Sequence, residues 1–581
     1  MRSRRLLAGV AVTAAALVTG VVQSPVVGAE ARDRAVKPSG AATQFNVLIE
    51  KGASRAQAVK AVKAAGGRVL RSNAQLGLLT VTAPRNGFVL DVSRSAAVVG
   101  AAKARPIGRT PEAKPRRDVV EKEAQHSPDA RRGKPGKDNR GATTAGTDPL
   151  DSKLWGLTMV RSDVARTVQA GDKGVTVGIL DSGIDARNPD IAPNFDAERS
   201  RNFVTDMPDI DGPCEFPSCK DPVGWDDSGH GTHVAGTVAA AANGTGLSGV
   251  APNVTLVEIR GGQDGGFLFL EPVVNALTYG ADIGLDVINM SFYIDPWLYN
   301  CTANPADSAE AQAEQRTIIA TVNRALNYAD KKGVTLVGSL GNNHEDLGKP
   351  RTDTSSPDYP MGTSYDRPID NNSCVDLPVE GPHVLGVSAL GPSGKKADYS
   401  NYGVEQISVS APGGWFRDGF GTPSFRANEN QILSTYPVNV LQAAGEVDAA
   451  GNITPLGASF GTIKDCPPGV TEYRQCGYYT YLQGTSMASP HVTGVAALIV
   501  SQFGQRDKRN GGLTLKPSKT EKILVDSAYE HACPTPRLQS YTAEGRSTEF
   551  DALCEGDAEF NGFYGSGIAD AYAAVKSRSG R

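Results

Sequence analysis

The sequence predicts an α/β fold class, in which a mainly parallel sheet lies between helices and a small α+β unit precedes it. Short Val- and Ile-rich runs recur from residue 147 onward, and they read VTVGIL, VTLVEI, DVINMS, VTLVGSL, HVLGVSA and QISVSA. Helical stretches at 230–242, 271–281 and 309–331 separate several of these runs. Apolar strands that alternate with helices are typical of a parallel sheet covered on both faces, and sites in such sheets gather at the carboxyl ends of the strands.

Length and composition indicate a globular protein with more than one folded unit. The chain has 581 residues, which is longer than one ordinary domain. Hydrophobic residues make up 40% and charged residues 21%, as expected for a protein with a core. The net charge of −4 is small for this length, so composition indicates no nucleic-acid or membrane-surface partner.

The first residues predict export. MRSRRLLAGVAVTAAALVTGVV begins basic and continues apolar, and VVGAEA offers small residues for cleavage after Ala29 or Ala31. This is the layout of a secretory signal peptide over 1–29, and it predicts a secreted, extracellular protein. A retained membrane anchor is the alternative, but the run is rich in Ala, Gly and Thr and closes on a cleavage-like site. No later stretch is long and apolar enough to span a bilayer. SRRLL resembles part of a twin-arginine signal, so the export route stays open.

The cysteines fit an oxidising compartment, where disulfides persist. There are eight, at positions 214, 219, 301, 374, 466, 476, 533 and 554. The simplest prediction pairs neighbours: Cys214–Cys219, Cys301–Cys374, Cys466–Cys476 and Cys533–Cys554, although eight cysteines allow 105 connectivities. A zinc site is the alternative, which the lack of any C-x2-C pair disfavours.

Residues 43–105 predict a small separate unit. FNVLIE, RVLRS, LGLLTVTA and AAVVGAAKA have the composition of strands. SRAQAVKAVKAAGG predicts a helix capped by Ser54 and ended by Gly66, and GFVLDVSRS predicts a second, short helix. The order β-α-β-β-α-β is that of a ferredoxin-like domain.

A linker is expected over 106–147. Between Ala101 and Arg140 the chain has twelve Lys or Arg, six Asp or Glu and five Pro, with almost no large apolar residue. Such a segment buries too little surface to offset the entropy of ordering, and we favour a solvated linker over a polyanion-binding tract.

The large domain then covers 148–581. Long surface loops are expected at 206–224, 345–375 and 412–480, and a last helix is expected in YGSGIADAYAAVKSRSGR.

Three motifs supply an acid, a base and a hydroxyl. Asp181 follows a strand in VTVGILDSGID, His230 begins a helix in DSGHGTHVAGTVAAAA, and Ser486 begins another in QGTSMASPHVTGVAALIV. Together these groups are the parts of nucleophilic acyl transfer, because a histidine must take the proton of the serine and a carboxylate must orient the imidazole. Singly, each has a plainer interpretation: a turn residue, a packed histidine and a helix cap. H-G-T-H also suggests metal ligands, but it lacks the acidic partner of H-E-x-x-H.

The strings DSGID, HGTHVAGT and GTSMASPHVTG, in that order, resemble the signature strings of the subtilisin-like serine proteases. The resemblance covers roughly 150–580 and implies a subtilisin-like three-layer fold and a serine endopeptidase. It implies that Asp181 orients the imidazole, that His230 is the general base and that Ser486 is the nucleophile. His233, one turn beyond His230, is expected to pack inside.

The resemblance also implies further site residues. VTLVGSLGNNHED resembles the segment with the oxyanion asparagine of the family, which is Asn342 here. DVINMSFYID resembles one of two segments beside which the substrate adds as a strand, at Ser291, Phe292 and Tyr293. The other is expected near Gly265–Leu268, including Gly266. Tyr293 stands where the family usually has glycine. Either the large phenol narrows or re-aims the first specificity pocket, or the local backbone shifts and Tyr293 is only a lid. The family preference for large apolar side chains is therefore not carried over.

A structural calcium ion is implied in the same way. NPDI matches a ligand carboxylate at Asp190, and AAAANGTGLSGVAP resembles the calcium loop of the family. The implied ligands are the Asn243 side chain and the carbonyls of Ala241, Thr245 and Leu247. Asp151 is a candidate for one further ligand. Oxygen ligands in a turn suit a hard cation, whereas the plainer interpretation is a turn that closes a helix.

Finally, the resemblance implies that residues 43–105 are an inhibitor-like prodomain that assists folding and is removed by self-cleavage within 103–147. The expected partners are a protein or peptide substrate and the chain's own prodomain, with no nucleic acid, no membrane after signal removal, and a monomeric mature form. The alternatives are a catalytically silent binding protein, a hydrolase of small esters, and a processing protease of restricted specificity.

Overall fold

The computed structural model describes residues 42–104 and 148–578. The predicted signal peptide over 1–29 and the predicted linker over 106–147 therefore lie outside the described residues. The described residues belong to one compact unit.

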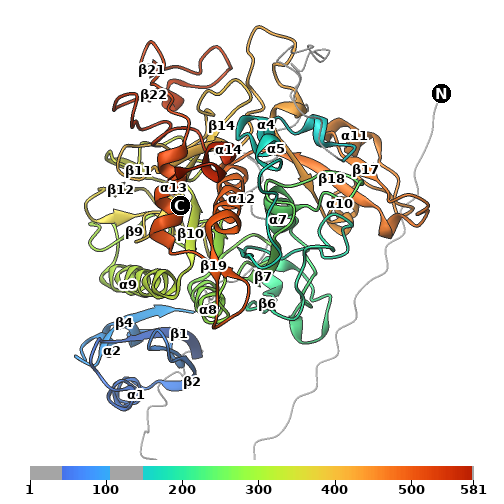
Figure 1. Ribbon diagram of the computed structural model, residues 1–581. Coiled ribbons are helices and arrows are strands. Elements are labelled where there is room, and N and C mark those ends of the chain that lie inside the picture. Colours follow the sequence, from blue (N-terminus) through green and yellow to red (C-terminus); the bar gives the residue numbers. More distant parts are fainter. Residues whose placement is uncertain (1–41, 105–147, 579–581) are drawn as a thin grey trace, which may run out of the picture. The chain divides into compact units, whose positions relative to one another are not determined.

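A seven-stranded parallel sheet forms the centre of the large domain, in the order β15-β14-β10-β8-β5-β7-β6 (Figure 1). All six apolar runs of the sequence are strands of this sheet. Its strands are β5 (Thr176–Leu180), β6 (Arg201–Asn202), β7 (Thr255–Arg260), β8 (Val287–Met290), β10 (Thr335–Ser339), β14 (Val384–Leu390) and β15 (Val409–Pro412).

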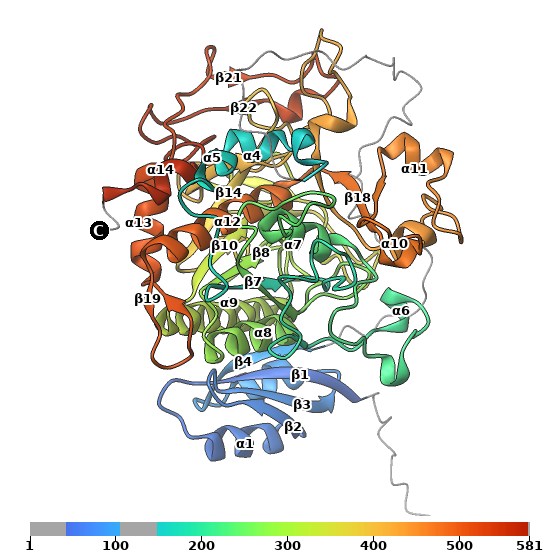
Figure 2. The same cartoon turned by 45° about the vertical axis from the view of Figure 1, so that its right-hand side comes forward.

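Helices cover both faces of this sheet, as Figure 2 shows. On one face, α7 (His230–Ala239) and α12 (Thr485–Phe503) pack together within one apolar cluster. On the other, α8 (Leu270–Asp282) and α9 (Ala309–Lys332) belong to a second cluster. Ser308 caps the start of α9, and Gly333, with a φ of 103°, ends it. The predicted three-layer α/β fold is confirmed.

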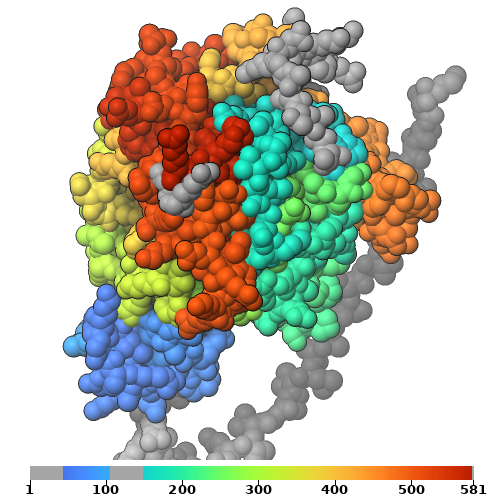
Figure 3. Space-filling model, viewed as in Figure 1, coloured from blue at the N-terminus to red at the C-terminus, as the bar shows by residue number. Residues whose placement is uncertain are grey.

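The remaining elements surround these layers. In Figure 3 the surface of α4 and α5 (teal) borders the orange and red surface of the C-terminal helices, and α5 contacts α14. These and the other small elements are η1 (Asp151–Lys153), α4 (Trp155–Met159), α5 (Ser162–Ala165), α6 (Pro208–Asp211), η2 (Pro217–Cys219), β9 (Asn300–Cys301), β11 (Arg351–Asp353), β12 (Arg367–Ile369), β13 (Cys374–Val375), η3 (Asn428–Asn430), η4 (Tyr473–Gln475), β19 (Gln505–Arg506), β20 (Leu513–Thr514), α13 (Pro517–Ser527), β21 (Leu538–Gln539), η5 (Thr548–Phe550), β22 (Ala552–Leu553) and α14 (Ala571–Val575). The last helix expected from the sequence is α14.

The expectation of a surface loop over 412–480 is wrong. This stretch has α10 (Val438–Ala443), α11 (Pro455–Phe460) and the antiparallel strands β16 (Ile432–Thr435), β17 (Ile463–Asp465) and β18 (Gly477–Leu482). Every residue of β16 and β18 is buried. The Gly- and Asn-rich segments between the strands masked the strand signal of GYYTYL, whose tyrosines are of a type enriched in strands.

Residues 42–104 form the predicted β-α-β-β-α-β unit. Its elements are β1 (Ala42–Ile49), α1 (Arg55–Ala64), β2 (Arg68–Asn73), β3 (Leu78–Pro84), α2 (Phe88–Ser93) and β4 (Val98–Lys103). The strands pair in the order β2-β3-β1-β4. Ser54 and Gln57 form a capping box at the start of α1, which explains why the helix begins there.

This small unit packs on α8 and α9. Four of its apolar residues share the cluster that includes these helices, namely Leu48, Leu76, Leu78 and Ala102. Glu271 of α8 accepts hydrogen bonds from Arg71 Nε at 2.6 Å and Thr80 Oγ1 at 3.0 Å. Lys103 Nζ lies 2.9 Å from Glu314 Oε1 of α9. Apolar burial and ion pairs therefore join the unit to the large domain.

All four predicted disulfides are present: Cys214–Cys219, Cys301–Cys374, Cys466–Cys476 and Cys533–Cys554.

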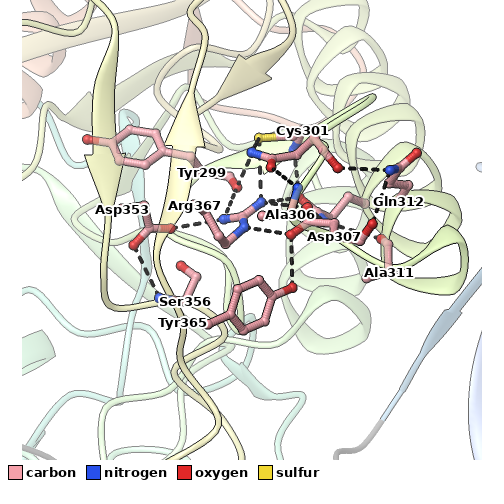
Figure 4. A network of polar contacts seen from close by, with 12 residues as sticks. Tyr299, Cys301, Ala306, Asp307, Ala311, Gln312, Asp353, Ser356, Tyr365 and Arg367 are labelled. Carbon is pink, nitrogen blue, oxygen red and sulfur yellow. Dashed lines mark hydrogen bonds and ion pairs between the residues drawn. The ribbon is translucent and has the colours of Figure 1, made fainter.

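Beside Cys301, the fully buried guanidinium of Arg367 pairs with Asp307 and Asp353, each at 2.9 Å (Figure 4). It also donates to Tyr299 O and Gln315 Oε1. This network joins β12 to α9 and to the preceding loops.

In the part of the chain that the structure describes, no helix combines the length and apolarity that crossing a membrane requires.

Candidate active site

The candidate residues gather at the carboxyl edge of the central sheet. Asp181 directly follows β5, Ser291 directly follows β8, and Asn342 lies in the turn after β10. His230 is the first residue of α7 and Ser486 the second residue of α12. Segments far apart in the sequence are therefore brought to the edge where ligands of parallel sheets bind.

Asp181 and His230 form a short pair. His230 Nδ1 lies 2.7 Å from Asp181 Oδ1, which also accepts the Ser182 N–H at 2.8 Å. The carboxylate is buried, whereas the imidazole keeps 20% of its side-chain surface exposed. Gly231 permits this approach, because a Cβ at that position would lie 2.2 Å from Gly183 O. The arrangement orients one ring nitrogen and leaves the imidazole accessible.

Asp226 organises the turn before His230. Its buried carboxylate accepts hydrogen bonds from the backbone N–H groups of Ser228, Gly229 and Thr232 and from the Thr232 hydroxyl. Asp226 is a positioning residue that our sequence analysis missed. The Asp-x-Ser-Gly string before His230 is a capping signal that could have indicated it.

His233 packs inside, as expected. It is fully buried, and its Nε2 lies 3.0 Å from Ile432 O. Burial lowers the pKa of His233 to about 3, so the ring stays neutral. Burial likewise lowers the pKa of His491 to about 4. Of the two histidines in H-G-T-H, only His230 is accessible to a substrate.

Ser486 and Asn342 meet at the start of α12. Ser486 Oγ donates to Ser291 O at 3.2 Å, and Ser291 Oγ donates to Ser486 O at 3.0 Å. Asn342 Oδ1 accepts from both the N–H and the hydroxyl of Thr485, each at 2.9 Å. Because these bonds hold the amide oxygen, the NH2 group of Asn342 is the end that can donate to a ligand.

The two candidate substrate segments pair with each other. The Asp295 N–H donates to Leu268 O at 2.9 Å, so the segment at Gly265–Leu268 meets the one that begins at Ser291. Gly266 has a φ of 85°, which a side chain would strain. Phe292 is buried, and the Tyr293 hydroxyl donates to Asp358 Oδ2 at 2.7 Å. This hydrogen bond ties the unusual tyrosine to the loop between β11 and β12.

The candidate calcium residues also lie together. Asp190 accepts hydrogen bonds from Asn243 Nδ2, Leu247 N–H and Tyr479 OH, and Asp190 O accepts the Ala241 N–H. The Thr245 N–H donates to Asn243 Oδ1 at 2.9 Å. Burial raises the pKa of Asp190 to about 7, and nearby Asp148 adds to this shift.

Asp148 is a residue of this group that our sequence analysis missed. Its Oδ1 accepts the Gly244 N–H, and its buried Oδ2 has no hydrogen-bond partner among the described residues. Asp151, the candidate named from the sequence, instead accepts hydrogen bonds from the N–H and hydroxyl of Ser248 and pairs with Arg166 at 3.5 Å. Asp148, three residues before Asp151, is therefore the acid that contacts the loop after α7 through Gly244, whereas Asp151 contacts Ser248 and Arg166.

Comparison with known proteins decides the family. The model of the subtilase family matches residues 172–567, which is more than half of the chain. The chain belongs to the subtilase family. This subtilase is a serine endopeptidase by family, and the α/β sheet described above is the subtilisin-like fold.

Individual relatives agree with this assignment. The subtilase is 27% identical to subtilisin DY of Bacillus licheniformis over 349 residues, 60% of this chain and 85% of that protein. It is 26% identical to fervidolysin of Fervidobacterium pennivorans over 395 residues, 66% of this chain but 41% of that protein, so it spans less than half of that relative. Among solved structures, the epidermin leader peptide processing serine protease from Staphylococcus aureus is similar in fold, with a TM-score of 0.58 and 18% identity over 92% of this chain and 98% of that one.

Proposed function

We propose that this subtilase is a secreted serine endopeptidase that is made as a self-processing zymogen and acts through Asp181, His230 and Ser486. The observation that carries the proposal is the 2.7 Å pair between Asp181 and His230 at the sheet edge where α12 presents Ser486. Acyl transfer needs an oriented, accessible imidazole that can take the serine proton, and His230 is oriented by Asp181 and accessible.

In the proposed reaction, Ser486 Oγ bonds to the carbonyl carbon of the scissile peptide while His230 takes the hydroxyl proton. Asp181 stabilises the imidazolium that forms. The Ser486 N–H and the Asn342 NH2 group donate to the oxyanion of the tetrahedral intermediate. His230 then gives the proton to the leaving amine, and the C–N bond breaks. Water then attacks the acyl carbon while His230 takes its proton. The bond between Ser486 Oγ and the acyl carbon breaks, His230 returns the proton to Oγ, and the acid product leaves.

We propose a structural calcium ion beside Asp190. The group offers oxygen donors only: the carboxylates of Asp190 and Asp148, the Asn243 side chain, and the carbonyls of Ala241, Thr245 and Leu247. The unpartnered oxygen of Asp148 fits such an ion, since a buried carboxylate without a donor is costly and a hard cation would satisfy it. Bound there, the ion would fix the loop after α7. We expect a chelator to lower the melting temperature of the wild type more than that of Asp190→Asn.

We propose that residues 43–105 restrain the enzyme until they are removed. Their contacts with Glu271 and Glu314 support this role. Ala104, the last described residue of the unit, lines the same pocket as Gln263, two residues before the candidate substrate segment. The chain beyond Ala104 therefore starts close to the place where a substrate strand would lie, which agrees with cleavage within 103–147.

The decisive experiment combines active-site labelling with processing. A fluorophosphonate probe is expected to label the wild type but not Ser486→Ala, and casein is expected to be digested by the wild type alone. Ser486→Ala made alone is expected to keep its full prosegment. Absence of labelling in the wild type would favour a silent binding protein, and labelling without casein digestion would favour an ester hydrolase. Normal processing of Ser486→Ala would show that cleavage does not occur in cis.

A restricted processing specificity is the second candidate, and Tyr293 favours it. The resemblance implies that the tyrosine stands beside the first specificity pocket, and its hydroxyl donates to Asp358. A peptide-library cleavage profile separates this candidate from a broad protease.

A further inference from the structure

The turn after β10 that presents Asn342 has an unfavourable backbone conformation. Gly341 has a φ of 99° and His344 a φ of 55°, so both residues lie in the left-handed region. Glycine adopts this region readily, but a residue with a side chain keeps such a conformation only where surrounding contacts impose it. The backbone on either side of Asn342 is therefore held by contacts from outside the turn.

Asn401, in the loop between β14 and β15, supplies such contacts through its side chain. Its Oδ1 accepts the N–H groups of Asn343 and Glu345, each at 3.0 Å. Its Nδ2 donates to Leu340 O at 3.0 Å. One amide group thus binds the chain both before and after Asn342.

The backbone of Asn401 binds the same turn at Gly341. The Asn401 N–H donates to Gly341 O at 2.9 Å, and a Cβ on Gly341 would lie 2.5 Å from Asn401 Nδ2. A side chain at position 341 would therefore displace the amide. Asn401 is fully buried, so water does not compete for these hydrogen bonds.

Other contacts support the later part of the turn. Tyr399 O accepts the His344 N–H at 2.8 Å, and the centroid of the Phe550 ring lies 4.0 Å from that of His344. Asn401 differs from these contacts because it binds residues on both sides of Asn342. It is therefore the contact best placed to fix the backbone from which the Asn342 side chain extends.

We propose that Asn401 is a positioning residue for the oxyanion site, which holds the turn so that the NH2 group of Asn342 points at the oxyanion. The proposal rests on the role proposed above for Asn342. Thr485 orients the amide of Asn342, whereas Asn401 places its backbone. Because a misplaced donor stabilises the transition state less, loss of the Asn401 amide is expected to lower kcat and to leave KM nearly unchanged.

The test is a double-mutant cycle on peptide hydrolysis by the processed enzyme. Asn401→Ala is expected to lower kcat about tenfold, with KM within about twofold of the wild type. In an Asn342→Ala background, the same change is expected to lower kcat less than about twofold, because the donor that Asn401 positions is already absent. An equal loss of kcat in both backgrounds would overturn the proposal, since Asn401 would then act on the fold and not through Asn342.

Asn304→Ala is the matched control. Asn304 is also a buried asparagine whose side chain binds backbone groups, since it donates to Pro368 O and accepts the Ala306 N–H. We expect its variant to keep the kcat of the parent in either background. If Asn401→Ala does not fold, Asn401→Ser takes its place, because a hydroxyl can still accept one of the hydrogen bonds; the same pattern with a smaller loss is then expected.

A second readout requires no catalysis. In the full chain with Ser486→Ala, amide hydrogen exchange at Asn343 and Glu345 is expected to become faster when the Asn401 variant is added and to stay unchanged with Asn304→Ala. Unchanged exchange in the Asn401 variant would also overturn the proposal. Failure of the proposed peptidase activity would instead appear as absence of hydrolysis by the wild type, which is a different result.

Discussion

At the scale of single residues, Thr485 of α12 sets the orientation of the Asn342 side chain. Thr485 donates two hydrogen bonds to the amide oxygen, so the NH2 group is the end of the side chain that is left to donate to a ligand. A preorganised donor of this kind acts on the charge that develops in the transition state, not on the bound substrate.

We therefore expect Asn342→Ala to lower kcat about 100-fold, a loss of about 3 kcal/mol of transition-state stabilisation, with KM nearly unchanged. Steady-state kinetics on a peptide substrate measure both constants. The adjacent Asn343→Ala is the control and is expected to behave as the wild type. A kcat for Asn342→Ala within twofold of the control would remove Asn342 from the mechanism.

Tyr293 departs from the glycine that the sequence resemblance leads us to expect at this position. Its ring occupies a position where glycine leaves space, and its hydroxyl is held by Asp358. We expect Tyr293→Gly to increase cleavage after large apolar residues about tenfold, because roughly one side-chain contact of 1–3 kcal/mol becomes available. Tyr293→Phe keeps the ring, so a cleavage profile of that variant that matches Tyr293→Gly would argue against a steric role.

At the scale of elements, β7 contains a buried acid with a defined pH effect. Glu258 is fully buried and accepts the Gly224 N–H at 2.8 Å. Burial raises the pKa of Glu258 to about 8, from an ordinary value of 4.5. Between these two values the folded state keeps a proton that the unfolded state has lost, so stability falls as pH rises through that window.

We expect Glu258→Gln to flatten this fall and to be more stable than the wild type at pH 9 by at least about 1 kcal/mol. Denaturant unfolding between pH 5 and 9 measures the difference, with the exposed Glu198→Gln as control. Parallel pH profiles of wild type and Glu258→Gln would contradict the assignment.

The elements also show what the sequence could predict. Strands such as β5 and β7 were predicted because they are apolar runs. The long helix α9 was predicted as a helical stretch at 309–331, and in the structure Ser308 and Gly333 mark its ends. The strands β16 and β18 were missed, since their partners are separated by Gly-rich insertions and only tertiary burial pairs them. The triad strings brought Asp181, His230 and Ser486 into one hypothesis. Asp148 and Asp226 lie outside these strings. The Asp-x-Ser-Gly spacing could have indicated Asp226, whereas only the folded chain brings Asp148 to the loop after α7.

At the scale of the whole molecule, the first folded unit and the large domain share an apolar cluster and a few charged contacts. Glu271 is central to these contacts, because it accepts from both Arg71 and Thr80. Hydrogen bonds to a charged group are worth about 1.5–3 kcal/mol each, less where they are exposed.

We expect Glu271→Ala to weaken restraint by residues 43–105, so that activity emerges several-fold sooner after the full chain is made. The matched control is Asp330→Ala, an acid of α9 that pairs with His383 at 3.8 Å and makes no hydrogen bond or ion pair with the described residues of the small unit. The time from synthesis to half-maximal peptide hydrolysis is the measurement. An unchanged interval would mean that the apolar cluster alone holds the unit in place.

The Cys301–Cys374 disulfide affects what happens when one molecule of this protease cleaves another. Cys301 and Cys374 enclose the exposed turn Met361–Ser364, and Arg367 on one side of that turn is bound to Asp307 and Asp353 on the other. A cut in the turn by a sister molecule would therefore sever the backbone without separating the pieces. Such nicked molecules would run as one band on a gel until a reductant is added, and the damage would go unnoticed in a preparation judged by size alone.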